Sequence, residues 1–592
     1  MDNQRLITWG LFGLLVYFTW QTWMQDYAPS APSEPANQST AQGALESKDR
    51  NNVADQADQL ADLAIDDQSL PQIGAPATSS EPAAATPLVD ADAAIITVRT
   101  DVLELKINTR GGTIQYASTL KYPVHKDLPD KKIVLLDTGA EDLGLIRSWL
   151  RNSTNPAAAP DANAVYTAAS SNYALGDKDE LVVPLTWENA DGTSVEKRFT
   201  LKRGSYVIDL QQILHNGSDA EWRGDQVTQL LRRSYEHERS MFDVDSYSYT
   251  GGVVYNGEKA EKLKRDDLLE DGPASFTAEN GWYASIEHHF LSAIIPAADT
   301  TNIYQVRVDD HVSTASVISA PETVAPGAST VFDRTLFIGP KLQEQLKEVH
   351  PKLTLSVDYG WLTILSHPLF LLLSWIHSFI GNWGVAIILV TALIKLAFYK
   401  LTEASGRSMA KMRELQPRMK ALQDRYKDDR QALSQAMMDL YKREKVNPAA
   451  GCLPILIQMP FFLSFYWVLV ESVEMRQAPF ALWITDLSSR DPYFILPLIM
   501  GAAMLVQQRL NPAPADPMQA RIMQIMPVMF TGFFAFFPSG LVLYWVTNTL
   551  LSIAQQWKIN KVVHAEALAR KAGKPKKPKK NKAGDDSDET LE

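Results

Sequence analysis

Residues 382–402 read NWGVAIILVTALIKLAFYKLT, an apolar run about as long as a helix needs to cross a bilayer, roughly 20 residues. Lys395 interrupts this run. A lysine inside a spanning helix costs at least about 2.5–3.5 kcal/mol. Two interpretations remain open from this segment alone. Either the side chain extends along the helix toward the headgroups near Thr402, or it faces a bundle interior or a wet cavity and has a function.

Further apolar runs of similar length predict about six spans in total, counting residues 382–402 as the second. Residues 6–23 are too long and too aromatic for a typical signal peptide, so we expect an uncleaved anchor within residues 1–26. Residues 361–380 are long enough to span. Their histidines and proline, and the Gly-Asn that follows, instead favour a helix in the membrane interface, within an amphipathic segment 341–381. The other four runs fall within residues 448–557: 453–470, 493–510, 521–537 and 541–557.

A large soluble portion accompanies these spans, because the mean hydropathy of the 592-residue chain is only −0.16. Residues 27–93 are rich in Ala, Ser, Pro, Gln and Asp, which predicts a disordered linker. Apolar and polar residues then alternate around Gly111-Gly112, the pattern of half-buried strands joined by a hairpin. The span 94–340 is therefore predicted to be one antiparallel all-β domain, a large sandwich. Similar strand patterns recur at 181–186, 196–214, 303–319 and 329–338.

Residues 403–447 predict a cytoplasmic helical hairpin. Lys and Arg outnumber Asp and Glu here, and residues 558–592 begin with a strongly basic run, so both segments are placed on the cytoplasmic side. Counting the spans back places the β-domain outside and both termini inside. Apolar residues recur at helical spacing, and we favour a hairpin seam over a methionine-lined surface for apolar clients. These residues are Met409, Met412, Leu415, Met419, Leu422, Leu433, Ala436, Met437, Leu440 and Tyr441.

Nothing in the spans resembles a catalytic set: they contain no Ser/His/Asp pattern, glycine-rich phosphate loop or carboxylate pair. The one cysteine excludes an internal disulfide. Glu287, His288 and His289 stand together beside a strand-like run, but neighbours on a strand point to opposite faces, so we expect no converging site there. An unpaired Lys395 in a small bundle instead indicates a wet groove, which would lower the barrier for a polar segment crossing the bilayer.

Four stretches of the helical part carry a family resemblance. Together they are similar to the membrane protein insertases of the YidC/Oxa1/Alb3 family, in the YidC form of Gram-negative bacteria, and the resemblance covers essentially the whole chain. The stretches are SMAKMRELQP (408–417), EKVNPAAGCLPILIQMPFF (444–462), SVEMRQAPFALWITDLSSRDPYFILP (472–497) and FPSGLVLYW (537–545).

The resemblance implies a multi-domain membrane protein. It would have a periplasmic β-supersandwich without known catalysis, and an N-terminal anchor followed by a five-helix core. The implied function is insertion and folding of inner-membrane proteins, alone or with the Sec translocon, with no covalent chemistry and no cofactor. The implied partners are nascent membrane proteins, the Sec translocon, membrane lipids, and the ribosome through the hairpin and the basic tail. The protein would be a multi-pass protein of the cell inner membrane.

The resemblance also assigns two sets of residues. Lys395 matches a groove arginine of the family, so the charge is kept but the planar five-donor fork is lost. The groove would further contain Thr391, Gln458, Tyr544 and Trp545. An apolar slide for incoming spans would be formed by Leu456, Met459, Pro460, Phe462, Ser464, Phe533 and Phe536.

Two other function classes are kept as alternatives. A transporter or channel would use Lys395 as its substrate or ion site, although the spans lack intramembrane carboxylates near Lys395 and show no paired internal repeats. An anchored carbohydrate-binding or mutarotase-like protein would place its function in residues 94–340. About six spans are more than an anchor needs.

Overall fold

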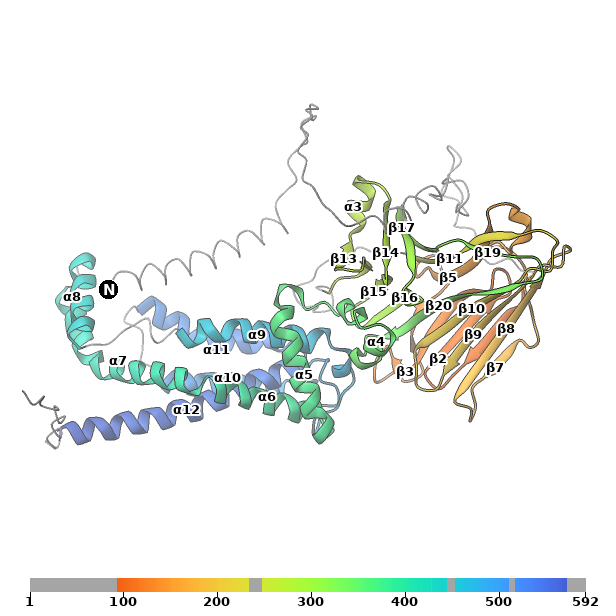
Figure 1. Ribbon diagram of the computed structural model, residues 1–592. Coiled ribbons are helices and arrows are strands. Elements are labelled where there is room, and N and C mark those ends of the chain that lie inside the picture. Colours follow the sequence, from red (N-terminus) through yellow and green to blue (C-terminus); the bar gives the residue numbers. More distant parts are fainter. Residues whose placement is uncertain (1–92, 234–247, 427–428, 445–452, 511–516, 572–592) are drawn as a thin grey trace, which may run out of the picture. The chain divides into compact units, whose positions relative to one another are not determined.

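The computed structural model describes residues 93–233, 248–426, 429–444, 453–510 and 517–571, which form a β-sandwich followed by a set of helices (Figure 1). The predicted anchor and most of the predicted linker lie outside the described residues. The strand patterns predicted between residues 94 and 340 are confirmed, and the Gly111-Gly112 turn has φ of 69° and 55°, which glycine adopts without a Cβ clash.

Two large sheets make up the sandwich. The first has eleven strands in the order β14-β17-β18-β11-β5-β3-β2-β1-β7, with β19 paired to β11 and β4 to β3. Its strands are β1 (Ile95–Arg99), β2 (Leu103–Asn108), β3 (Thr113–Pro123), β4 (Lys132–Leu136), β5 (Gly144–Asn152), β7 (Asn172–Ala174), β11 (Trp222–Arg233), β14 (Ala274–Glu279), β17 (Thr301–Asp309), β18 (Val312–Ser319) and β19 (Glu322–Val324).

The second sheet has nine strands in the order β13-β12-β15-β16-β20-β10-β9-β8-β6. Its strands are β6 (Thr167–Ala168), β8 (Glu180–Glu188), β9 (Ser194–Lys202), β10 (Val207–His215), β12 (Gly251–Tyr255), β13 (Ala260–Leu263), β15 (Trp282–Ile286), β16 (Phe290–Pro296) and β20 (Ser329–Pro340). Burial alternates residue by residue along β8, β9 and β10, so one face of each strand packs into the core. The two sheets share that core: Val98 and Leu105 of the first cluster with Phe199 and Leu210 of the second.

A lysine is buried inside this core. Lys197 of β9 is fully buried, donates to the carbonyl oxygens of Gly111, at 2.6 Å, and Ser148, and its Nζ lies 4.9 Å from the centre of the Tyr166 ring. Desolvation lowers the pKa of Lys197 to about 7.

We expect the free energy of unfolding of the sandwich to rise with pH because of Lys197. The unfolded state, with an ordinary lysine pKa, binds more protons at Lys197 than the folded state between pH 7 and 10. The contribution of Lys197 to stability therefore rises across that window, by up to about 4 kcal/mol, and is constant below it. Lys197→Met should reduce this slope to the part that Lys341 contributes, because burial also lowers the pKa of Lys341, to about 8. Lys202→Met, on the exposed end of the same strand, should keep the full slope. Denaturant unfolding of the full chain at several pH values, followed by β-sheet circular dichroism, measures the slope. An unchanged slope in Lys197→Met would contradict a buried, titrating lysine.

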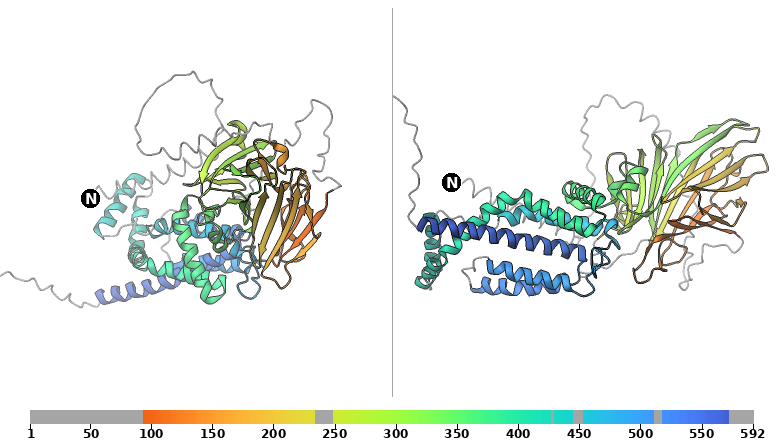
Figure 2. Two further views of the ribbon diagram at one scale, coloured as in Figure 1. Left: turned by 45° about the vertical axis from the view of Figure 1, so that its right-hand side comes forward. Right: turned by 90° about the horizontal axis from the view of Figure 1, so that it is seen from below.

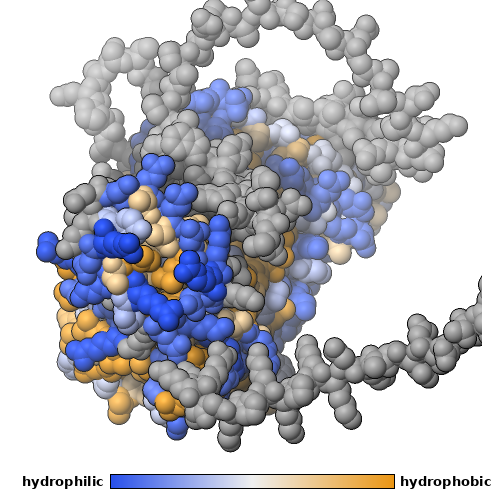
Figure 3. Space-filling model, turned by 90° about the vertical axis from the view of Figure 1, so that its left-hand side faces the viewer, coloured by the Kyte–Doolittle hydropathy of each residue, from blue (hydrophilic) through white to orange (hydrophobic). Residues whose placement is uncertain are grey.

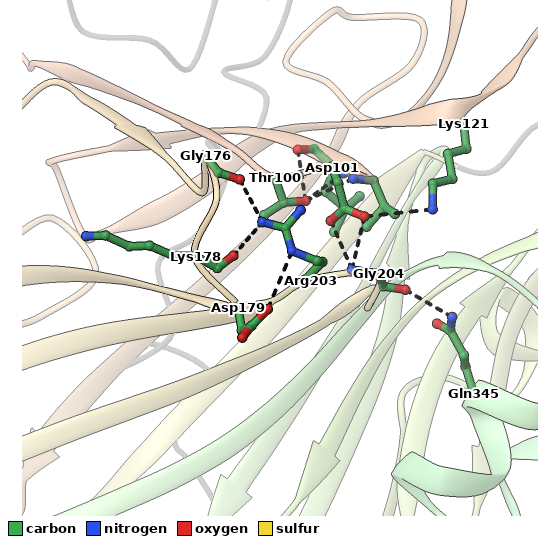
Figure 4. Close-up of polar contacts among 11 residues, drawn as sticks. Thr100, Asp101, Lys121, Gly176, Lys178, Asp179, Arg203, Gly204 and Gln345 are labelled. Atoms are coloured by element: carbon green, nitrogen blue, oxygen red, sulfur yellow. Dashed lines mark hydrogen bonds and ion pairs between the residues drawn. The ribbon is translucent and has the colours of Figure 1, made fainter.

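A cluster of polar contacts ties the two sheets together at one rim (Figure 4). Asp101, between β1 and β2, accepts from the backbone N–H of Gly204, in the β9–β10 turn of the other sheet. Arg203 donates to the carbonyl oxygens of Gly176 and Lys178, both at 2.7 Å. Gln345 of the following helix donates to the carbonyl oxygen of Gly204 at 3.1 Å. The connector to the helical part is therefore fastened to the sandwich.

Short helices lead from the sandwich to the helical part. Leu346 and Leu353 are fully buried and belong to the same cluster as Trp282 of the sandwich, so the connector completes the sandwich core. The short helices of the described chain are η2 (Pro156–Ala158), α3 (Arg265–Glu270), α4 (Gln343–Val349), η4 (Leu353–Ser356), η5 (Gly360–Leu362) and η7 (Val473–Met475).

Longer helices form the remainder. The predicted tight turn at 537–540 is confirmed, because α11 ends at Phe534 and α12 begins at Ser539. The last helix is longer than predicted and continues into the predicted tail. The helices are α5 (Thr363–Ile380), α6 (Trp383–Ala397), α7 (Tyr399–Arg425), α8 (Arg430–Arg443), α9 (Leu453–Glu471), α10 (Ile495–Leu510), α11 (Pro517–Phe534) and α12 (Ser539–Lys571).

The structure does not have the single continuous helix that was predicted over residues 382–402. The chain bends by 67° at Phe398, between α6 and α7. No proline or glycine causes the bend. The Phe398 ring instead packs edge-on against Phe461 of α9, and α7 packs along α12, where a Cβ on Gly406 would clash with Ile559. Lys395 is thereby placed in the last turn of α6.

Helix α5 runs crosswise to α6, α9 and α10 in the views of Figures 1 and 2. It packs on α6 and α9 through buried residues such as Leu373 and Ile376, while Ile364 and Phe379 are largely exposed. By length and composition alone, Gly360–Ile380 is one described helix that could cross a membrane, and the bent pair of α6 and α7 is a second candidate. A crosswise helix with an exposed apolar face favours the predicted interfacial placement, which stays a prediction.

Helices α7 and α8 form the predicted hairpin, and its seam is confirmed. Leu415 and Met419 are buried between the two helices, packed against Met412, Met437 and Leu440. Hydrophilic residues make up most of the coloured surface at this end of the molecule (Figure 3). The methionines of the seam therefore stabilise the hairpin itself.

Candidate functional site

The side chain of Lys395 turns into the helix bundle. Its Nζ donates to Ser552 Oγ of α12 at 2.9 Å and to Gln458 Oε1 of α9 at 3.4 Å. Gln458 Nε2 in turn donates to Asn548 Oδ1 at 3.1 Å, and Ser552 Oγ donates to the Asn548 carbonyl oxygen at 2.7 Å. Three helices thus meet at one ammonium group. These contacts do not support the interpretation in which Lys395 extends along its helix toward the headgroups.

The acceptors around Lys395 are neutral. Among the described residues, no carboxylate lies within ion-pair distance of its Nζ. Hydroxyl and amide oxygens solvate an ammonium group but do not cancel its charge. A neutral oxygen is also displaced more easily than a carboxylate, because charge-assisted pairs are roughly twice as strong. The site thus combines an ammonium group with displaceable neutral oxygens, an arrangement that suits an acidic or polar segment.

Three other predicted groove residues make their contacts outside this network. Thr391, one turn before Lys395, is buried and donates to the Ile387 carbonyl oxygen at 2.7 Å within its own helix. Tyr544 is buried and packs against Phe465 with ring centroids 4.8 Å apart. Trp545 packs edge-on against Phe462 at 4.7 Å.

Trp545 also connects the two helices that carry the predicted slide. Its ring lies 4.7 Å from Phe462 of α9 and 4.9 Å from Phe534 of α11. Four slide residues are substantially exposed: Leu456 at 47%, Met459 at 46%, Phe533 at 38% and Phe536 at 46%.

The remaining slide residues are less accessible. Pro460 and Phe462 are half-buried. Ser464 is fully buried, and its carbonyl oxygen accepts from Ser366 of α5 at 3.2 Å. Ser464 therefore faces α5 and is not available to an incoming helix in this structure.

At the ends of α9 and α10 that lie nearest the sandwich, two aspartates fix the segment that joins these helices. Asp486 accepts from the Gln477 and Ser488 backbone N–H groups and from the Ser488 and Ser489 hydroxyls. Asp491 is buried and accepts from Trp483 Nε1 at 3.0 Å and from the backbone N–H of Leu496, at the start of α10, at 2.7 Å. This segment, residues 472–494, is called the cap below.

Known families and relatives match most of this chain. Residues 95–372 match the family described as YidC periplasmic domain, and residues 375–566 match 60Kd inner membrane protein. A membrane protein insertase YidC of Thioalkalivibrio sulfidiphilus is 47% identical over 490 residues, which are 81% of this chain and 86% of the relative. That of Methylococcus capsulatus is 48% identical over 474 residues, 79% and 86% of the two chains. The chain belongs to the YidC family of membrane protein insertases.

A solved structure of an active YidC insertase covers 78% of this chain and 94% of its own, with 21% identity and a TM-score of 0.37. Membership of the YidC family places the sandwich in the periplasm. The cap, at the sandwich end of α9 and α10, is accordingly on the periplasmic side.

Two members of the polar network were missed by the sequence reasoning. Asn548 and Ser552 follow Tyr544 at intervals of four residues, so the three share one face of the last span. Polar residues repeated at that spacing inside an apolar run are a signal for a functional face. Their partners on α6 and α9 were not deducible, because the helix packing that brings them together is not written in any local pattern.

The strand alternation assumed for residues 287–289 was wrong, although the three side chains do not meet at one site. Residues 287–289 form the turn between β15 and β16, so strand alternation does not apply. His288 and His289 do converge: their rings stack with centroids 3.7 Å apart, and both Nε2 atoms lie about hydrogen-bond distance, 2.9 and 3.0 Å, from the Val470 carbonyl oxygen of α9. Glu287 instead pairs with Arg232. Among the described residues, no group of three or more His, Cys, Asp or Glu side chains forms a metal site.

Proposed function

We propose that this insertase draws the polar, translocated part of a client into a groove around Lys395. The observation that supports the proposal is an ammonium group held at the meeting of α6, α9 and α12 by neutral oxygens alone. The membrane potential acts in the same direction for an acidic segment moving outward, with about 2.3 kcal/mol per charge per 100 mV. No covalent chemistry is needed.

The hydrophobic span of the client would lie against the slide on α9 and α11. Exposed Met459 and Phe533 offer flexible and aromatic surface of the kind that accepts varied apolar partners. The aromatic contacts of Trp545 hold α9 and α11 at a fixed separation behind this surface. The charged groove would thus receive the polar segment of a client while the apolar slide receives the hydrophobic span of the same client.

The partners and topology that we propose follow from charge and family. The cytoplasmic hairpin and the basic tail would meet the ribosome, whose RNA attracts Lys-rich segments. Clients that need more than the groove would be passed between this protein and the Sec translocon. The protein would lie in the inner membrane with both termini in the cytoplasm, in contact with lipids.

Site-specific photocrosslinking tests the slide. With ribosomes carrying a stalled nascent membrane protein, a crosslinker at Met459 or Phe533 should react with the client's hydrophobic span. Leu393 is a matched control, because it is 43% exposed and stands on the same helix as Lys395 but outside the predicted slide. Equal crosslinking from all three positions would indicate non-specific contact through lipid. Crosslinking from Leu393 alone would move the client path to another face and revive Lys395 as a transport site, for which ion or solute flux in proteoliposomes is the assay.

A further inference from the structure

A cavity of about 810 Å³ lies where the cap meets the sandwich. Its walls come from the β3–β4 hairpin, the β15–β16 turn, the end of α9 and the cap itself. We propose that this cavity binds an anionic phosphate headgroup, that of a lipid in the periplasmic leaflet. The proposal is independent of the client groove, so its failure leaves the groove and slide untouched.

The charge of the cavity favours an anion. Three permanent cations line it, Lys126, Arg476 and Arg490, against the carboxylates of Asp127 and Asp486. The Asp486 carboxylate is already satisfied by the four donors of the cap described above, and the Asp127 side chain is 87% exposed and 3.3 Å from His125.

Arg490 is the cation best placed to bind a ligand. It is exposed at the cavity, and within the described part of the chain its guanidinium has no hydrogen bond or ion pair. A guanidinium offers a planar fork of donors that matches a phosphate. Ser488 and Ser489 line the same cavity.

The walls are held in place by contacts between the cap and the sandwich. Arg476 donates to the Val124 carbonyl oxygen at 3.2 Å, Gln477 donates to that of Pro123 at 3.0 Å, and Lys126 donates to that of Thr485. Arg476 and Lys126 are therefore preorganised, and binding an anion would have to order only Arg490.

The surroundings of the cavity favour a lipid as the source of the phosphate. Leu469 and Val470, at the end of α9, and Phe494, just before α10, line it. The cavity thus lies where two predicted spans end on the side of the sandwich, which is the depth expected for lipid headgroups. Tyr493 and Leu482 of the cap are 66% and 86% exposed, and aromatic and aliphatic side chains at this depth pack against lipid.

The backbone of the cap supports a functional role for this surface. Leu482 and Phe494 have φ of 54° and 56°, a left-handed conformation that bulky residues rarely adopt. Such strain persists only where the surroundings impose it, and it concentrates at functional sites.

Native mass spectrometry of the full-length protein in detergent tests the proposal. Wild type should retain dioleoylphosphatidylglycerol in preference to dioleoylphosphatidylcholine. Arg490→Gln should weaken the tightest phosphatidylglycerol site by about tenfold, the loss of one charge-assisted hydrogen bond. Lys126→Gln should weaken it in the same direction. Arg223→Gln, which removes an exposed arginine of β11 elsewhere on the sandwich, should leave the affinity unchanged.

A competition arm separates the two sources of phosphate. Retention of phosphatidylglycerol in excess millimolar inorganic phosphate assigns the site to lipid, whereas displacement assigns it to a free phosphate. Equal retention of the two lipids by wild type overturns the proposal, and so does phosphatidylglycerol binding that is the same in wild type, Arg490→Gln and Lys126→Gln. Circular dichroism of each variant confirms that it is folded.

Discussion

Lys395→Ala is expected to reduce insertion of clients with short acidic translocated segments by at least about tenfold, while Lys395→Arg retains most of the activity. At an effective dielectric of about 20, two unit charges 4 Å apart attract by about 4 kcal/mol, and a third of that is worth a factor of ten. Arginine keeps the charge and adds donors, so it preserves this attraction. Insertion into inverted membrane vesicles, measured by protease protection of the translocated segment, gives the result.

The hydrogen bonds of Lys395 predict a graded series beside it. Ser552→Ala removes the acceptor at 2.9 Å but leaves Gln458, so the ammonium stays in the groove and insertion should fall less than in Lys395→Ala. Lys400→Ala is the matched control, because Lys400 is exposed on α7 just beyond the bend and lies outside the network. A Lys395→Ala protein that inserts acidic-segment clients like wild type would rule out a required charge. Clients with uncharged translocated segments should be affected least.

The existence of the sandwich and the helices was predictable because each follows from a local period. Alternating strands such as β9 and the apolar runs of the spans carry their signal in a few consecutive residues. The bend at Phe398 carries none, since apolar sequence continues through it. Packing of Phe398 on Phe461 and of α7 on α12 decides it, and both partners are far away in sequence.

Strand β11 was missed for a related reason. It is buried over most of its length, yet Gln226, Thr228 and Gln229 interrupt its apolar pattern. These polar groups are tolerated because they bond to other strands: Gln226 Nε2 donates to Gln212 Oε1 at 2.9 Å, and Gln229 Nε2 donates to Ser316 Oγ at 3.1 Å. A sequence shows the polar residue, but it shows neither that the residue is buried nor which partner stabilises it. The same limit explains why Lys395 was predicted as a site while Asn548 and Ser552 were not.

Asp491→Ala is expected to be the most destabilising single change in the cap. Asp491 is buried and accepts from Trp483 Nε1, from the Tyr493 backbone N–H at 3.1 Å and from the Leu496 backbone N–H. Alanine leaves all three donors without this acceptor, and each buried unsatisfied group costs about 1–3 kcal/mol. We expect a loss of about 3 kcal/mol or more, and an apparent melting temperature lower by about 5–10 °C in detergent.

Asp491→Asn provides the graded control for this prediction. Its remaining oxygen can still accept from Trp483 and Tyr493, while the new amide nitrogen faces the Leu496 N–H, so about a third of the effect is expected. Asp179→Ala should melt like wild type, because the Asp179 side chain is 98% exposed. If Asp491→Ala melted at the wild-type temperature, the cap would be held mainly by Asp486 and the groups that donate hydrogen bonds to Asp486. Lys395→Ala should change insertion without changing melting, whereas Asp491→Ala should change melting first. The two variants therefore separate the charge at Lys395 from the integrity of the cap that joins α9 to α10.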